Sequence, residues 1–196
     1  MESSVSLAKT RRFWRLRSGP RPFYRWRVPG AFVVGALTLA LAEPSATSQL
    51  FALALITPGL GLRLWAAGHL EKTRRLATGG PYRHTQHPLY LGSFLIALGV
   101  AVAAAHPWVL LTVAAYLLAF FPYVMRNERE FLHKRFGSEY ELWAAEVPAF
   151  FPRLLPAGPQ GTRFEWRRVL ANNEWQACLA PPAALALLYL KDVLIP

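Results

Sequence analysis

The sequence predicts an all-α, polytopic integral membrane protein with about five transmembrane helices and a cytoplasmic amphipathic helix. Hydrophobic residues make up 54% of the 196-residue chain and charged residues only 17%, which is too apolar for an ordinary soluble domain. No Asp, Glu, Lys or Arg occurs from Pro88 to Met125. This run is nearly twice the ~20 residues that cross a bilayer as a helix, so it must fold back on itself.

Uncharged runs define the five predicted helices. The long run turns at His106-Pro107, because Pro starts helices but disfavours helical geometry in the residue before it. Glu43-Pro44 separates two earlier runs in the same way. The predicted helices are therefore residues 28–42, 45–62, 88–105, 107–125 and about 175–190. No internal repeat or low-complexity linker divides the chain, so residues 1–196 are expected to form a single membrane domain.

Basic residues gather on one side of these helices. Residues 1–27 and 71–87 are rich in Lys and Arg, whereas the turns near Glu43 and His106 contain neither. Short basic loops stay cytoplasmic, so we predict a multi-pass cell (inner) membrane protein with its N-terminus inside and its C-terminus outside. The domain would then contain a basic cytoplasmic segment (1–27), four transmembrane helices with a cytoplasmic loop (28–125, loop 71–87), a cytoplasmic helical segment (126–174) and a last transmembrane helix (175–196).

The net charge of +11 could also serve nucleic-acid binding. Basic residues that flank apolar helices more often contact lipids, so we expect membrane lipids and no nucleic acid as partners. The stretch at residues 10–16 resembles a twin-arginine signal, but its arginines lie far from the apolar run. The nearby Trp14 and Trp26 suit interfacial anchors instead. The single cysteine, Cys178, excludes an intramolecular disulfide.

The stretch GGPYRHTQHPLYLG precedes the long apolar run. Pro88 at the first helical position makes His87 the N-cap and puts Tyr90 in the first turn. Such a helix start favours an anionic group, and Gly79-Gly80 allows a sharp bend. The stretch is equally typical of a site for a small, partly anionic ligand and of a helix anchored at the membrane interface.

Two short helices are predicted after the fourth apolar segment, at residues 127–136 and 138–146, with Gly137 between them. In the first of them Glu128 shares the apolar face, whereas Glu130 lies on the polar face. A carboxylate on a buried face needs a partner. That partner is either a cytoplasmic arginine or a cationic or hydroxyl-bearing ligand.

The order of GPYRHTQHPLYLG, a helical hairpin and EREFLHKRFGSEYELWAAEVPAFFP resembles the isoprenylcysteine carboxyl methyltransferase family, which includes related phospholipid methyltransferases. The resemblance covers roughly residues 63–152. It implies a membrane enzyme that transfers a methyl group from S-adenosylmethionine to a lipophilic acceptor, either an isoprenylcysteine-type carboxylate or a lipid group. It also implies a set of cofactor-binding residues: His69, Arg74, Arg75, Leu76, Ala77, Tyr82, His87, Pro88, Tyr90 and Glu128.

The chain departs from the family pattern at three positions. It has Gln86 where the family usually has Arg, and Arg129 where a second Glu is usual. Val124 stands where carboxyl-methylating members have a substrate-binding arginine. The resemblance therefore implies a methyltransferase without naming its acceptor. The alternative is a non-enzymatic membrane protein that binds lipid or a partner through its basic face.

The remaining chemistry to consider is a metal site. His84 and His87 could be joined by His69, but no Cys or carboxylate completes the set nearby, and methyl transfer from a sulfonium needs no metal. We therefore expect no metal. The expected mechanism is in-line displacement by a lipophilic nucleophile, in which catalysis is mostly positioning and exclusion of water, so no catalytic acid or base is assigned.

Overall fold

The structure, a computed structural model, describes residues 21–71, 75–158 and 160–194, and only the backbone of residues 21–25. The basic residues before position 21, with the twin-arginine stretch, lie outside the described residues, as does Arg74. The described elements are α2 (Arg21–Leu41), α3 (Ala46–His69), the 3-10 helix η1 (Gly80–Arg83), α4 (Pro88–Ala103), α5 (Pro107–Phe136), α6 (Ser138–Glu146), α7 (Trp166–Ala171) and α8 (Glu174–Leu194).

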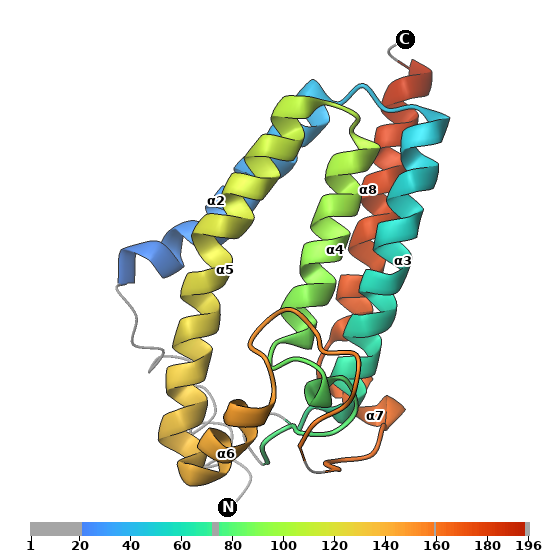
Figure 1. Cartoon of the computed structure of the whole chain (residues 1–196). Helices are drawn as coiled ribbons and strands as arrows, with labels where there is room; N and C mark the ends of the chain where they lie inside the picture. Colours follow the sequence, from blue (N-terminus) through green and yellow to red (C-terminus); the bar gives the residue numbers. More distant parts are fainter. Residues whose placement is uncertain (1–20, 72–74, 159, 195–196) are drawn as a thin grey trace, which may run out of the picture.

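The long helices form two groups that diverge from one end of the molecule (Figure 1). Helices α3, α4 and α8 run side by side, while α5 leans away from them with α2 against it. The two groups meet where α4 turns into α5, and η1, α6 and α7 gather at the other end. Close packing of α3 on α4 depends on small residues, since a Cβ at Gly59 would lie 2.8 Å from the carbonyl oxygen of Gly92.

The prediction of an all-α, polytopic membrane protein is confirmed. By length and composition, the described helices α3, α5 and α8 are long and apolar enough to cross a membrane. The apolar parts of the other two, Trp26–Leu41 and Pro88–Ala103, are shorter. Helix α8 runs unbroken through Pro181 and Pro182. The short helix α7, which precedes it, was not predicted.

The predicted break after residue 125 is wrong. Helix α5 is one 30-residue helix that begins at Pro107 and ends before Gly137, whose φ is 53°. At about 1.5 Å per residue it is about 45 Å long, compared with about 30 Å for the hydrocarbon layer. Its last third therefore extends beyond the layer as a continuation of the membrane helix, and α6 follows at once, with the predicted bounds.

The predicted end of the second apolar helix at residue 62 is also wrong, because α3 continues to His69. Arg63 interrupts the apolar pattern without interrupting the helix. Its guanidinium forms an ion pair with Glu174 at the start of α8, with Nη2 and Oε2 2.7 Å apart. A charged side chain that is paired in this way can lie inside a membrane helix.

Candidate cofactor site

The loop of residues 75–87 leads from the end of α3 into α4 and contains half of the predicted cofactor residues. It bends at Gly80, whose φ of 56° favours glycine. A Cβ at Gly80 would also lie only 2.5 Å from Cε1 of His69, so the loop backbone packs directly on that ring. The helical turn η1 then places Tyr82 in the interior, where it is 6% exposed.

Helix α6 and the segment that follows it hold the loop in place. The Trp143 indole donates to the carbonyl oxygen of Tyr82 at 3.2 Å, and the Thr85 hydroxyl donates to that of Phe150 at 2.9 Å. The backbone amide of Arg153 donates to the carbonyl oxygen of His84 at 3.0 Å. Two of these three bonds use carbonyl oxygens of the loop's main chain, so they fix the course of the loop with little dependence on its side chains.

Gln86, one of the departures from the family pattern, has a clear structural role. Its buried amide group donates to the carbonyl oxygens of Val147 (2.6 Å) and Ala144 (3.1 Å) at the end of α6. The hydroxyl of Tyr140 donates to its Oε1 at 3.4 Å. An amide can both donate and accept here, whereas the guanidinium of the Arg that is usual in the family has no acceptor. Gln86 therefore ties the loop to α6.

We expect Gln86→Ala to lower the free energy of unfolding by about 1–2 kcal/mol, because two buried carbonyl groups lose their donor. The measurement is unfolding of the purified protein in mixed micelles. Gln176→Ala, at an exposed position on α8, is the matched control and should have little effect. Equal stability of the two variants would show that the Gln86 amide is not needed to hold α6.

Four predicted residues from different elements converge at the start of α4. His87 is its N-cap and Pro88 its first residue, as expected. Nδ1 of His87 lies 3.8 Å from Oε2 of Glu128 on the extended third of α5. The His87 ring packs edge-on against Tyr90, with centroids 5.6 Å apart, and Tyr90 packs in turn on Phe121 at 5.7 Å. The continuous α5 is thus what brings Glu128 to the loop.

The protonation states follow from burial. Desolvation, with a smaller effect of Arg129, lowers the pKa of His87 to about 4, so the imidazole is neutral at physiological pH. Its 3.8 Å contact with Glu128 is then too long for a hydrogen bond and is not an ion pair. His87 Nε2 is buried and has no hydrogen-bond partner among the described residues. A ligand atom at this point would satisfy it.

Tyr82 belongs to the same group of residues. Burial, followed by the negative charges of Glu128 and Glu174, raises the pKa of its phenol well above the usual range, and Arg63 opposes this only in part. The hydroxyl therefore remains a hydrogen-bond donor at any physiological pH. The charges of Glu128 and of the Arg63–Glu174 pair thus act on Tyr82.

The other predicted residues have different surroundings. Leu76 and Ala77 are buried in a small core with Tyr82 and Trp143. His69 is buried beneath the loop, and its Nδ1 lies 2.9 Å from the carbonyl oxygen of Trp65, which accounts for one ring nitrogen. Arg75 is exposed. The structure thus brings some of the predicted residues together at the start of α4 and places the others around the loop.

The Arg63–Glu174 pair was missed. Arg63 donates to Glu174 Oε2 through Nε (3.1 Å) and Nη2 (2.7 Å), and through Nη1 to Ser93 and to the carbonyl oxygen of Leu89. It thereby joins α3, α4 and α8 beside Tyr82. The only signal in the sequence was an arginine within an otherwise apolar helical run, and nothing local pointed to a partner 111 residues away.

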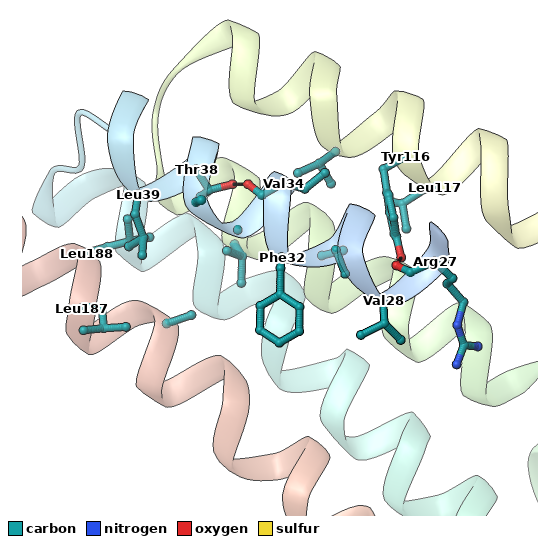
Figure 2. A pocket seen from close by; sticks show the side chains of 17 residues that line it. Arg27, Val28, Phe32, Val34, Thr38, Leu39, Tyr116, Leu117, Leu187 and Leu188 are labelled. Carbon is teal, nitrogen blue, oxygen red and sulfur yellow. Dashed lines mark hydrogen bonds between the residues drawn. The ribbon is translucent and has the colours of Figure 1, made fainter. Parts of the chain in front are cut away.

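A groove of about 750 Å³ lies between α2, α4, α5 and α8, away from the loop (Figure 2). Its lining is apolar apart from Arg27, Thr38 and Tyr116, and none of the predicted cofactor residues contributes to it. The Tyr116 hydroxyl donates to the carbonyl oxygen of Arg27 at 3.0 Å, which fastens α2 to α5 at one end of the groove. Phe121, one turn after the groove residue Leu117 on α5, contacts Tyr90. Helix α5 thus connects the groove with the predicted cofactor residues.

Known proteins resemble this chain in sequence. The phospholipid methyltransferase family matches residues 33–139. The nickel-cobalt-cadmium resistance protein NccN of Alcaligenes xylosoxydans xylosoxydans is 34% identical over 76% of this chain and 75% of its own. The cobalt-zinc-cadmium resistance protein CzcN of Cupriavidus metallidurans is 33% identical over 66% of this chain and 62% of its own.

The protein-S-isoprenylcysteine O-methyltransferase of Schizosaccharomyces pombe is 30% identical over 53% of this chain and 43% of its own, so the similarity to it covers less than half of that enzyme. No solved structure matches the chain. The family match covers more than half of the sequence, including the loop and the part of α5 that carries Glu128. The chain therefore belongs to the phospholipid methyltransferase family and is a membrane methyltransferase.

Proposed function

We propose that this protein transfers a methyl group from S-adenosylmethionine to a lipophilic acceptor, and that the cofactor binds between the loop of residues 75–87, the start of α4 and the extended third of α5. The observation that carries the proposal is the convergence of Tyr82, His87, Tyr90 and Glu128. These residues offer a carboxylate, a buried imidazole nitrogen, a phenol donor and an aromatic face in one place.

Each group suits a different part of the cofactor. The carboxylate of Glu128 accepts hydrogen bonds from ammonium or ribose hydroxyl groups. The first turn of α4, which its N-cap side chain does not cap, favours the cofactor's carboxylate. Tyr90 offers a flat face, and His87 Nε2 a further polar contact. When bound, S-adenosylmethionine supplies an electrophilic methyl group on a sulfonium, so the protein's task is to orient the reactants and exclude water.

The groove beside α2 is our candidate for the apolar chain of the acceptor. Its size falls within the range of about 300–1,000 Å³ that is usual for small-molecule sites. It is bounded by membrane helices, so a chain can enter from the bilayer. Phe121 follows the groove residue Leu117 by one turn of α5 and packs on Tyr90, so we infer that a chain in the groove would direct its polar end toward the cofactor residues.

Gly35 provides a test of this assignment, because it lines the groove and a Cβ there would meet nothing within 4 Å. We expect Gly35→Phe to lower methylation of an apolar acceptor by about tenfold, since excluding roughly two methylene groups from an apolar site has that effect. The assay uses radiolabelled S-adenosylmethionine with S-farnesylcysteine or phosphatidylethanolamine. Gly61→Phe, equally open but on α3 outside the groove, is the control. If both variants lose the same activity, the groove is not the acceptor site.

The proposed cofactor is tested by calorimetry of the detergent-solubilised protein with S-adenosylhomocysteine, the product of the donor. We expect saturable binding with one ligand per chain. Absence of heat and of any thermal shift at millimolar ligand would rule out the cofactor assignment.

The names of the two metal-resistance relatives describe a phenotype rather than a reaction. The described residues contain no group of three or more His, Cys, Asp or Glu that could hold a metal ion.

We also propose that the loop and α6 face the cytoplasm, in a cell (inner) membrane, as the distribution of Lys and Arg favours. Cysteines placed at Thr47 and Arg75 test this, because both positions are exposed and lie at opposite ends of α3. In a Cys178→Ser background, a membrane-impermeant thiol reagent outside intact cells should label position 47 and not position 75. Labelling of position 75 alone would show that the protein has the opposite orientation in the membrane.

A further inference from the structure

The extended third of α5 carries a basic hollow on the side away from Glu128. Its lining consists of Arg126, Arg129, Glu130, His133 and Lys134, with Tyr140 of α6, and its volume is about 460 Å³. The α5 residues are spaced by three and four positions, which places them on one face of the helix. None of them belongs to the proposed cofactor site.

The hollow lies where lipid headgroups are expected. The uncharged part of α5 ends at Met125, and Arg126 is the first charged residue after it. Clusters of Lys and Arg directly after a membrane helix are attracted to anionic lipids. The hollow is thus at the level of the membrane surface, at the end of the molecule that carries the loop.

The charges of the hollow are only partly compensated. Arg126 pairs with Glu130 at 3.3 Å, and His133 lies 2.6 Å from Glu141 of α6. The side chains of Arg129 and Lys134 are exposed. Within the described part of the chain, neither has an ion pair with a carboxylate. Two cations therefore remain available on a surface already bordered by Arg126.

We propose that this hollow binds the phosphate of an anionic phospholipid headgroup, from the leaflet that borders the loop. Guanidinium and ammonium groups are the usual phosphate ligands in proteins. The apolar part of α5 adjoins the hollow, so the acyl chains of a bound lipid can remain in the bilayer. A free phosphate has no acyl chains and would gain nothing from this apolar surface. The proposal does not depend on the cofactor assignment.

The hollow is also connected to the loop. Tyr140, which lines it, donates to Gln86, the residue directly before His87. The charge of Arg129 acts on His87 as well. A headgroup in the hollow would thus adjoin Tyr140 and Arg129, which act on the two residues directly before α4. The lipid composition of the membrane could in this way affect the start of α4.

The experiment is native mass spectrometry of the protein after equilibration with equimolar phosphatidylglycerol and phosphatidylcholine of identical chains. We expect the wild type to retain phosphatidylglycerol preferentially. Arg129→Gln with Lys134→Gln should lower that preference by about 30-fold, or about fivefold for either change alone, since each cation near the surface contributes about 1 kcal/mol. Arg163→Gln with Arg167→Gln removes two exposed arginines elsewhere and should leave the preference intact.

Three results would overturn the proposal. Equal retention of the two lipids by the wild type would exclude a headgroup site. An equal loss in the two double variants would show a diffuse effect of positive charge. Displacement of phosphatidylglycerol by inorganic phosphate at matched concentration would show a site for free anions. The single Lys134→Gln variant, at an exposed position, keeps the test decisive should the double variant fail to fold.

Discussion

Arg63→Ala should lower the free energy of unfolding by about 3–5 kcal/mol, because it leaves Glu174 buried without its partner. The side chains of Arg63 and Glu174 are 19% and 9% exposed, so water cannot replace the lost contacts. The same change also removes the donors to Ser93 and Leu89, and with them a link between three helices. Unfolding of the purified protein in mixed micelles would measure the loss.

Arg126→Ala is the matched control, since it breaks an ion pair of similar type whose side chains are 81% and 48% exposed. That pair should contribute less than about 1 kcal/mol. Replacing both Arg63 and Glu174 with Leu should cost less than Arg63→Ala alone, because no buried charge is left unpaired. A loss for Arg63→Ala no larger than that for Arg126→Ala would mean that Glu174 finds water or another partner.

Glu128→Ala should weaken the binding of S-adenosylhomocysteine by roughly 1.5–3 kcal/mol, or about 10- to 150-fold, the range for charge-assisted hydrogen bonds. This expectation rests on the proposed cofactor site. The structure places Glu128 beside the buried His87 and within electrostatic reach of Tyr82. Calorimetry on the folded variant would measure the affinity.

Glu130→Ala is the control, two residues along the same helix. The carboxylate of Glu130 pairs with the exposed Arg126, one turn earlier on α5. Its removal should change the affinity less than threefold, since exposed pairs of this kind contribute about 0.3–0.5 kcal/mol. Equal losses in the two variants would remove the distinction between the two faces of α5 and, with it, the role proposed for Glu128.

The sequence correctly predicted the helix ends that are set by a single proline or glycine. Pro88 and Pro107 begin helices because their rings fit the first helical position, and Gly137 ends one because its φ is positive. The predictions were wrong where contacts with residues far away in the sequence determine how far a helix extends. Arg63 remains helical because Glu174 pairs with it across the bundle. The predicted break after residue 125 had no residue to cause it, since no glycine or proline lies between Pro122 and Gly137.

The candidate site divides in the same way. Motif spacing indicated His87, Tyr90 and Glu128, and the structure brings them together. The groups that hold the loop could not be predicted from the sequence, because the carbonyl oxygens that accept from Gln86 and Thr85 belong to the backbone and leave no side-chain pattern. The role of Gln86 becomes clear only when α6 is in place.

The continuity of α5 couples the tilt of its membrane part to the position of Glu128. Glu128 and the apolar residues before it belong to one continuous helix, so a change in the inclination of that helix in the bilayer would move the carboxylate relative to His87. Membrane helices adjust their tilt when the hydrocarbon thickness changes. The separation of Glu128 from the start of α4 is therefore sensitive to bilayer thickness, which would appear as S-adenosylhomocysteine affinity that varies with lipid chain length.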